Sequence, residues 1–463
     1  MKQMTGGAEK VSRHVMLVSS PKIEQHPNGR VRLRSDISCK GRWSGKSIYT
    51  RKFWTDFDAP AETKSVYFET DKSFADFLCH ERSDAFLVGL LPWAMRTGQD
   101  IECESPVTEE LLYNINNMLI PAIAKHDPRL HRIKVTAPTD STSLAGKEVG
   151  TGLSLGVDSF YTVLEMLNSD YKVSKLTHLM YTSSRGTEEE GRIPKHESQA
   201  RREESEKVAG ILNIPIVFID TNFRLEFPVS HRHGNPYTNL SSVFALRKMW
   251  RTYFYSTSFE LSEFSVKDSS LANADHYLLL LTHVFTTPEL SFYPSDLHVI
   301  RAEKVDAIAD FEVAQKHLRV CLRAPKNCNT SMKCIRTLLD LDMYGHLDKF
   351  RESFDVDYYL ENKVWYLRAL YLKPDYPLFA PAREHFLKTE PELMKQAQEL
   401  AEEELKEKKK KKQAEKIKKQ KEKIESQERE IARLKKELKQ SEPFIKKLTP
   451  KRILRRLSKV LRG

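Results

Sequence analysis

The sequence predicts an α/β protein built around a parallel sheet. Between residues 147 and 219, segments with the composition of strands alternate with segments typical of helices. Strands and helices that alternate at these lengths form parallel sheets with right-handed crossovers. A polar turn, residues 154–159, follows the first of these strands, where such sheets usually bind ligands. With 463 residues, the chain is long enough for two or three folded units.

The part that precedes the parallel sheet, residues 1–146, is expected to form an N-terminal α+β region without visible chemistry. Residues 30–58 alternate polar and apolar positions, and residues 66–68 add a short strand signal. Apolar residues crowd together between 74 and 95 and lie on one side of 106–123. This pattern favours buried helices.

The parallel sheet itself is expected within residues 147–350. Its strands are predicted at 149–155, 176–181 and 214–219, and its helices at 159–167 and 197–212. Residues 351–390 are expected to be a helical connector between this domain and the C-terminal tail.

The net charge of +11 belongs to the tail of the chain. Residues 401–463 contain 24 Lys and Arg but only 11 Asp and Glu, which leaves residues 1–400 with a net charge of −2. The globular part is therefore close to neutral, and its charge does not indicate nucleic-acid binding. The N-terminus is polar, and no apolar run approaches the roughly 18 residues of a spanning helix. We expect a cytoplasmic protein, either free or peripheral at the inner face of the membrane.

Within the tail, residues 391–441 are predicted to form a charged helix with half of a coiled-coil seam. Apolar residues recur at every seventh position: Ile417, Ile424, Ile431 and Leu438. Gln420 and Gln427 stand where a second apolar row would be. Two interpretations remain open, a coiled coil that joins copies of the chain into a homo-oligomer and a solvated helix without a partner.

The last segment, residues 442–463, is basic and amphipathic. Pro443 and Pro450 are expected to end the preceding helix, and the apolar residues after them recur at helical spacing opposite Lys and Arg. Such a segment can lie on an anionic membrane surface, contact RNA phosphates or dock on its own protein.

The turn after the first parallel strand combines hydroxyl groups, a glycine and a carboxylate. The hydroxyls of Ser154 and Ser159 can donate to phosphate oxygens, and Gly156 lets the backbone approach closely. Asp158 can hold the magnesium ion that accompanies a nucleotide. The same residue types also form ordinary helix N-caps, so these residues alone leave both interpretations open.

The turn resembles the Ser-Gly-Gly-x-Asp-Ser signature of the N-type ATP pyrophosphatases, the PP-loop group. It matches at Ser154, Gly156, Asp158 and Ser159, whereas Leu155 replaces a glycine. Residues 327–337, with Cys321 upstream, are similar to the cysteine-rich knuckle of PP-loop proteins that resemble 7-cyano-7-deazaguanine synthase. Residues 301–304 look like a segment of a poorly characterised bacterial branch of this group. Together the resemblance covers roughly residues 65–350.

This resemblance implies a Rossmann-like domain of the adenine nucleotide alpha hydrolase type over residues 147–350. Such proteins bind ATP and magnesium, transfer AMP to a carboxylate or amide oxygen and release pyrophosphate. The substrate would be a small-molecule acid or a nucleobase-like compound. The resemblance assigns catalysis to Asp158 and Ser159 and magnesium to Asp158. It assigns the phosphates to the following residues: Ser154, Gly156, Val157, Asp158 and Ser159.

Other candidate residues lie further along the chain. Arg301 and Lys304 either contact phosphate or substrate, or are plain surface charges. Cys321, Cys328 and Cys334 provide three of the four ligands that structural zinc requires, because Ser331 stands where the knuckle usually has another cysteine. His317 is the candidate for the fourth zinc ligand. The competing interpretation is three buried structural thiols.

Three functional hypotheses follow from these observations. The first is an active adenylating enzyme, and the second is an inactive scaffold of the same fold that acts through its coiled-coil tail. The third is an RNA-modifying enzyme whose basic tail binds the nucleic acid. The substitution at Leu155 favours the second hypothesis, and the strand-turn-helix context of the turn favours the first.

Overall fold

The computed structural model describes residues 14–40, 63–184, 195–267, 273–321, 324 and 326–446, with the side chains of all of these except 40, 195–198 and 438–446. The chain divides into two compact units. The first comprises Met1–Glu361 and Pro377–His385, and the second comprises Asn362–Tyr376 and Phe386–Gly463.

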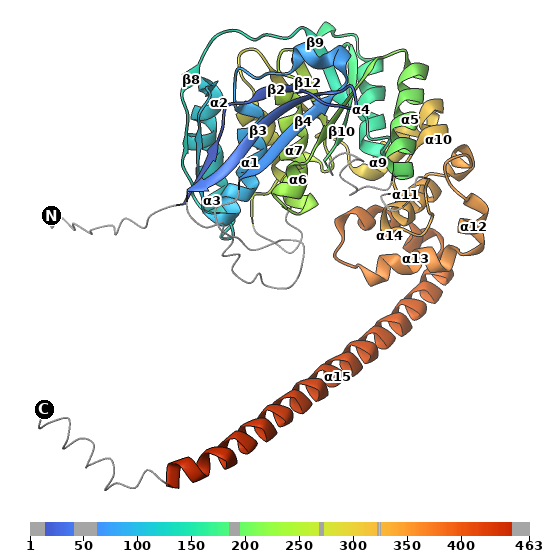
Figure 1. The fold of residues 1–463 in the computed structure, drawn as a ribbon. Helices are drawn as coiled ribbons and strands as arrows, with labels where there is room; N and C mark the ends of the chain where they lie inside the picture. Colours follow the sequence, from blue (N-terminus) through green and yellow to red (C-terminus); the bar gives the residue numbers. More distant parts are fainter. Residues whose placement is uncertain are drawn as a thin grey trace, which may run out of the picture. The chain divides into compact units, whose positions relative to one another are not determined.

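Five parallel strands form one half of the sheet in the first unit (Figure 1). They are β9 (Glu148–Gly152), β10 (His178–Ser183), β11 (Ile216–Thr221), β12 (Trp250–Ser256) and β13 (Ser291–Ser295). The order β13-β12-β9-β10-β11 places the first strand centrally, and the direction of winding reverses between β9 and β12. This order is that of a Rossmann-like sheet, so the predicted α/β class with a parallel sheet is confirmed. β9 ends three residues earlier than predicted because Leu153 already begins the turn.

The other half of the sheet is formed by the N-terminal region. Its strands are β1 (Val15–Val18), β2 (Lys22–Gln25), β3 (Val31–Lys40), β4 (Lys64–Thr70), β5 (Asp100–Cys103) and β7 (Val135–Thr136). β4 runs antiparallel to β11, with Thr70 opposite Ile219, and the sheet then continues in the order β4-β3-β1-β5-β7. β6 (Val107–Thr108) and β8 (Thr139–Asp140) form a separate small sheet. Residues 1–146 and 147–350, expected as two regions, therefore share one continuous sheet.

Buried ion pairs reinforce the junction between the two halves. Glu69 on β4 is fully buried and accepts hydrogen bonds from Arg30, at 2.8 Å, and from Arg32. Arg30 also pairs with Asp220 on β11. Because Glu69 and Asp220 lie opposite each other in the antiparallel ladder, one guanidinium group bridges both strands.

Helices cover both faces of the sheet. The crossovers through α4 (Val157–Asn168) and α5 (Lys195–Leu212) step in one direction, whereas the crossover through α7 (His231–Ala245) steps in the other. Right-handed crossovers of opposite direction place their helices on opposite faces. α1 (Asp84–Thr97) packs against α7 and is buried from Asp84 to Met95. It ends at Gly98, whose φ of 72° is the left-handed conformation that closes many helices.

The remaining helices of the first unit are mostly short. They are α2 (Glu109–Asn114), α3 (Ile120–His126), α6 (Phe223–Glu226), α8 (Leu278–Phe285), α9 (Arg301–Ala307), α10 (Glu312–His317), α11 (Met332–Met343) and α12 (Val356–Glu361). A π-helical segment, η2 (Ile115–Leu119), joins α2 to α3. Short 3₁₀ turns are η1 (Lys72–Phe77), η3 (Lys172–Ser174), η5 (Leu261–Glu263), η6 (Ala274–Tyr277), η7 (Ile308–Asp310), η8 (Leu347–Phe350) and η9 (Pro377–Phe379). α9 packs against both α4 and α11. This packing brings residues of α9 and α11 close to the N-terminal end of α4, although they are far from it in the sequence.

The second unit consists mainly of α13 (Lys363–Leu372) and the 56-residue helix α15 (Pro391–Lys446), which pack against each other. α14 (Ala380–Thr389) precedes α15. Lys363 on α13 pairs at 2.7 Å with Glu390, the residue before α15, and Arg368 on α13 pairs at 2.9 Å with Glu404 in α15. Every side chain from Leu405 to Glu437 is exposed. The helix continues through Pro443 to Lys446, so the expected break at that proline is wrong.

The basic segment of the tail lies mostly outside the described residues. The backbone is described only to Lys446, so the predicted membrane or RNA contacts of residues 442–463 stay predictions. Among the helices of the described ranges, none is both long and apolar enough to cross a bilayer.

Candidate functional site

The predicted phosphate turn lies at the carboxyl end of β9, beside the reversal of winding between β9 and β12. Its first residue, Leu153, is fixed to β10 by a 2.8 Å hydrogen bond from its N–H to the carbonyl of Met180. α4 then begins at Val157, with Gly156 as its N-cap and without a capping side chain from any described residue. The N-terminal end of α4 therefore carries the partial positive charge that favours anions.

The turn is closed by its own hydroxyl groups. The oxygens of Ser154 and Ser159 lie 3.2 Å apart, and the Ser159 hydroxyl donates to the carbonyl of Gly156 at 3.0 Å. Ser154 is exposed, whereas Ser159 is buried. A Cβ atom on Gly156 would lie 3.2 Å from Oγ of Ser154, a tight contact that would require the Ser154 side chain to shift slightly. The structure thus brings together all five residues predicted in this turn, with Val157 and Asp158 in the first turn of α4.

Leu155 adopts the backbone conformation of a glycine. Its φ is 60°, in the left-handed region, which costs a leucine about 1–2 kcal/mol. Its side chain is buried, and burial of a leucine contributes roughly 1.5–3 kcal/mol, enough to offset that strain. A leucine therefore occupies a conformation that a glycine adopts without strain. The turn nevertheless keeps the conformation and absorbs the strain.

Asp158 and Arg301 form the central ion pair of the site. Oδ1 of Asp158 lies 3.0 Å from Nη1 of Arg301, and the two side chains are 27% and 6% exposed. Burial disfavours the charged form of Asp158, but the charges of Arg301, Lys304, Arg336 and Lys333 outweigh it and lower the pKa of this carboxyl. Because Arg301 is buried and paired, its interpretation as a plain surface charge is wrong.

Lys304 is also buried, which excludes a plain surface charge there as well. Its ammonium group donates to the carbonyl of Thr257 at 2.8 Å, to the Thr257 hydroxyl at 3.3 Å and to Asp296 at 3.0 Å. These three acceptors match the three donors of a lysine. Lys304 therefore holds the ends of β12 and β13 together and supplies positive charge, rather than a spare donor for a ligand.

A polar layer beneath the turn was not predicted. The hydroxyl of Thr162, one helical turn after Asp158, lies 2.8 Å from the hydroxyls of Ser256 and Ser295. These serines end β12 and β13, and Asp296 follows with a φ of 64°. The rule that ligand sites form at the carboxyl ends of parallel strands would have indicated these residues, but both strands lie beyond the predicted ones.

The helix α11 brings further charged residues that were not predicted as part of the site. Lys333 is exposed by surface area, but desolvation of its ammonium group and the like charges of Arg336 and Arg301 lower its pKa to about 8. Burial raises the pKa of Asp340 to about 7, and neither of its carboxylate oxygens has a hydrogen-bond partner among the described residues. Residues 333, 336 and 340 are spaced three and four positions apart, which places them on one face of a helix. This spacing is the only sequence feature that could have indicated that they act together.

Positively and negatively charged side chains lie close together at this site. Four cations gather around Asp158: Arg301, Lys304, Lys333 and Arg336. Asp275, on the 3₁₀ turn η6, is close enough for the charge of Asp158 to matter; burial and that charge raise the pKa of Asp275 to about 7. Cations beside a helix N-terminus and a carboxylate are suited to a polyphosphate accompanied by a divalent metal.

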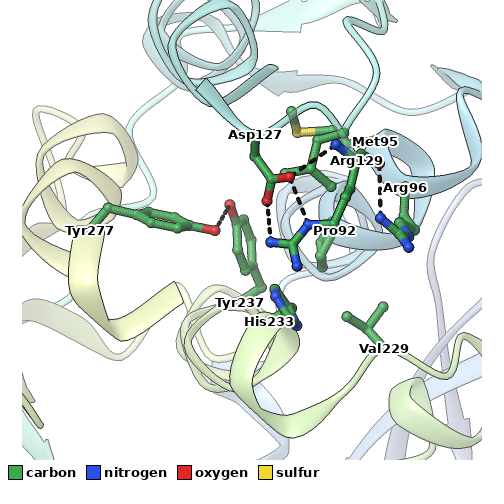
Figure 2. A pocket seen from close by; sticks show the side chains of 10 residues that line it. Pro92, Met95, Arg96, Asp127, Arg129, Val229, His233, Tyr237 and Tyr277 are labelled. Atoms are coloured by element: carbon green, nitrogen blue, oxygen red, sulfur yellow. Dashed lines mark hydrogen bonds and ion pairs between the residues drawn. The ribbon is translucent and has the colours of Figure 1, made fainter. Parts of the chain in front are cut away.

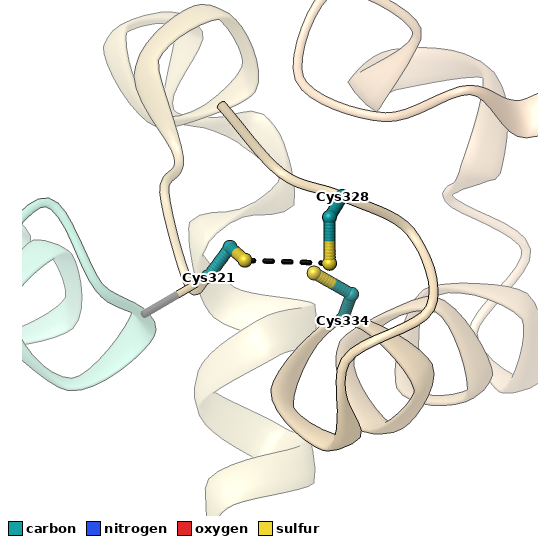
Figure 3. A group of neighbouring side chains, drawn as sticks. All are labelled: Cys321, Cys328 and Cys334. Carbon is teal, nitrogen blue, oxygen red and sulfur yellow. Dashed lines mark hydrogen bonds between the residues drawn. The ribbon is translucent and has the colours of Figure 1, made fainter. Parts of the chain in front are cut away.

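The three predicted zinc ligands converge in the structure. The sulfur atoms of Cys321, Cys328 and Cys334 all lie within 4.8 Å of one another (Figure 3), with 3.4 Å between those of Cys321 and Cys328. Partial burial disfavours the thiolate of Cys328, but the Cys321 thiol and the groups of Thr330 and Ser331 lower its pKa to about 6. Thiolates bound to one zinc ion at about 2.3 Å would lie about 3.8 Å apart, so the cluster is close to that geometry.

His317 does not join this cluster. Its Nδ1 faces Oε1 of Glu204 on α5, and the histidine is buried there. Ser331 lies 3.1 Å from the Cys334 sulfur, but its oxygen caps α11 by accepting the Cys334 amide. The described residues therefore provide three thiol ligands for a metal ion and leave its fourth position open.

A cavity lies elsewhere in the first unit, between α1, the residues after α3 and the start of α7 (Figure 2). Its polar end carries Arg129, which binds Asp127 at 2.7 Å, while Tyr237 and Tyr277 meet at 3.4 Å. The volume is about 40 Å³, room for only a few waters. No residue of the phosphate turn lines it, so it is not the predicted nucleotide site.

Comparisons with known proteins do not extend this description. No protein-family model, no curated protein and no solved structure matches the chain. The function must therefore be argued from the site itself.

Proposed function

We propose that this protein binds ATP with magnesium at the turn after β9 and transfers AMP to a carboxylate or amide oxygen, releasing pyrophosphate. The observation that carries the proposal is the Asp158–Arg301 pair, held at the open N-terminus of α4 and at the reversal of winding in the sheet. A polyphosphate there would meet main-chain N–H groups, and Asp158 would hold the magnesium ion.

The chemistry needs groups that favour the departure of pyrophosphate. An acceptor oxygen is a poor leaving group until it is adenylated, whereas pyrophosphate departs readily when fixed positive charge neutralises it. Arg301, Lys333 and Arg336 supply such charge beside the turn. Ser154 and Ser159 would donate to phosphate oxygens once the ligand replaces their mutual contact. The acceptor would be a small-molecule acid or a nucleobase-like compound.

Calorimetric titration of the full chain with ATP, with and without magnesium, tests the proposal. We expect wild-type binding to strengthen when magnesium is added. Asp158→Asn should remove this dependence on magnesium, because the carboxylate is lost while Arg301 remains. Asp170→Asn, at an exposed position, is the matched control and should keep it. If the wild type binds no ATP, the site is inactive and the proposal is wrong.

The alternative of an inactive scaffold rests on the substitution at Leu155. The main chain at residue 155 nevertheless keeps the left-handed conformation that a glycine would adopt, so the shape of the turn is compatible with the phosphate-binding hypothesis. An RNA-modifying role predicts salt-dependent RNA binding that is lost on removal of residues 401–463.

We further propose zinc as the metal of the cysteine cluster. Three convergent thiols with one low pKa suit a soft, thiolate-binding ion, and the low pKa of Cys328 favours the deprotonated ligand. A bound ion would supply structural cross-linking between the start of α11 and the segment before it.

A further inference from the structure

The exposed part of α15 carries an apolar row on an otherwise charged helix. Four side chains of this row are 47–54% exposed: Ile417, Ile424, Ile431 and Leu434. In heptad terms the isoleucines occupy the first core position, called a, and the second, called d, is held by Gln420, Gln427 and Leu434. An exposed row of this kind favours association with another helix.

We propose that α15 pairs with α15 of a second copy as an antiparallel, two-stranded coiled coil, whose two-fold axis passes between Glu425 and Ser426. In an antiparallel pair each a residue faces a d residue, whereas in a parallel pair a faces a and d faces d. The orientation therefore decides what the two glutamines meet. This inference rests on α15 alone and does not depend on the nucleotide site.

The core layers favour the antiparallel arrangement. In the proposed register Ile417 faces Leu434 of the second copy, Ile424 faces Gln427, and Ile431 faces Gln420. Every layer then contains an isoleucine, and no glutamine faces a glutamine. A parallel pair would bury two Gln–Gln layers, at positions 420 and 427, within only six layers. Each of the two glutamines at the d positions, Gln420 and Gln427, would therefore face a glutamine only in a parallel pair.

The flanking charges favour the same arrangement and fix its register. The positions beside the core are called e and g. In an antiparallel pair each e residue faces an e residue of the second helix, and each g residue faces a g residue. Lys416 then faces Glu437 of the second copy, Lys421 faces Glu428, and Lys423 faces Glu430, and symmetry repeats each pair. Glu437 also accepts from Arg433 of its own helix at 3.1 Å, and a carboxylate has room for both donors.

Other arrangements lose part of this complementarity. A parallel pair would keep the attraction of Lys423 to Glu428 and of Glu430 to Lys435 of the second copy, but it would set Lys416 against Lys421. Antiparallel pairs shifted by one heptad would set Glu428 against itself or Lys423 against itself. Exposed pairs contribute little energy each, but like charges that face each other suppress the wrong register.

Cysteine cross-linking of the full chain tests the orientation. Ile417→Cys and Leu434→Cys are made in separate chains with different tags, and each is oxidised alone and after mixing. We expect a disulfide-linked dimer only in the mixture, because two copies of residue 417 would lie about 25 Å apart. The wild type, with its six natural cysteines, is the control. Cross-linking of either variant alone to itself would indicate a parallel pair and overturn the proposal.

Charge reversal tests the register by sedimentation equilibrium over a concentration series. Lys423→Glu should weaken dimerisation about tenfold, since it turns two attractive pairs into repulsive ones. Adding Glu430→Lys in the same chain should restore the dimer, whereas adding Glu428→Lys should not. The proposal would be overturned if Glu428→Lys, added to Lys423→Glu without Glu430→Lys, restored the dimer. It would also be overturned if the wild type stayed monomeric at every concentration.

Discussion

The main-chain N–H of Arg319 donates a 2.7 Å hydrogen bond to the carbonyl oxygen of Leu155. Arg319 lies two residues before Cys321, so the strained residue of the phosphate turn is tied directly to the segment that enters the cysteine cluster. The backbone of the phosphate turn and the backbone of the cysteine segment are thus joined by a direct hydrogen bond.

The strain at Leu155 is measurable by comparing two small replacements. Leu155→Ala and Leu155→Gly both remove the buried side chain, but only glycine accepts a φ of 60° without penalty. We expect the glycine variant to be more stable than the alanine variant by about 1 kcal/mol, the reverse of their usual order. Urea unfolding checks this. An alanine variant at least as stable as the glycine variant would contradict the assigned conformation.

Metal analysis by plasma mass spectrometry tests the cysteine cluster. The purified chain should contain about one zinc ion, and Cys334→Ser should lose it and be destabilised by about 2 kcal/mol. Cys103→Ser, also buried but outside the cluster, is the control and should retain the metal. A chain that contains no metal and takes up none on reconstitution would favour three structural thiols.

Removal of the buried carboxylate at Glu69 should be severely destabilising. Glu69→Gln removes the buried carboxylate that Arg30 and Arg32 share; Arg30 keeps Asp71 and Asp220, but breaking a buried pair of this kind typically costs about 3–5 kcal/mol. Glu24→Gln breaks an exposed pair with Arg34 and should change the free energy of unfolding by no more than about 0.5 kcal/mol. Equal effects of the two substitutions in urea unfolding would show that the junction does not depend on this network.

The raised pKa of Asp340 predicts a pH dependence. Its folded value of about 7 exceeds the value of about 4 in an unfolded chain, so the native state binds this proton more tightly. The contribution of Asp340 to stability is therefore present below about pH 4 and is lost as the pH rises from about 4 to 7. Asp340→Asn has no proton to lose, and its free energy of unfolding relative to wild type should rise over the same interval. Urea unfolding across this range checks it, and a constant difference would refute the assignment.

The parallel half of the sheet was predictable because its signals are local. The strand, turn and helix around Asp158 follow one another within twenty residues, and the turn chemistry could be recognised there. Arg301 was predicted as a candidate site residue, but its pairing with Asp158 was not. The two residues are 143 positions apart, and no local sequence pattern indicates that they meet. Lys333, Arg336 and Asp340 were hidden for the same reason, since only the packing of α9 between α4 and α11 brings them to the turn.

The attachment of the N-terminal region had no sequence signal at all. The ladder between β4 and β11 joins residues about 150 positions apart, and its central residue, Glu69, is a carboxylate in the interior. A charged residue in a short strand usually indicates an exposed face. Here three arginines and two further carboxylates surround it, and only the folded structure reveals that set.

Synthesis of the chain leaves β4 without its β11 partner for a long interval. β4 ends at Thr70, whereas β11 begins at Ile216. At about 5–20 residues per second, the ribosome needs roughly 7–30 s to bridge that gap. During this time the backbone N–H and C=O groups on the open edge of β4 are a template for pairing with other chains. The β4 edge of the nascent N-terminal region is therefore open to pairing with other chains until β11 has been made.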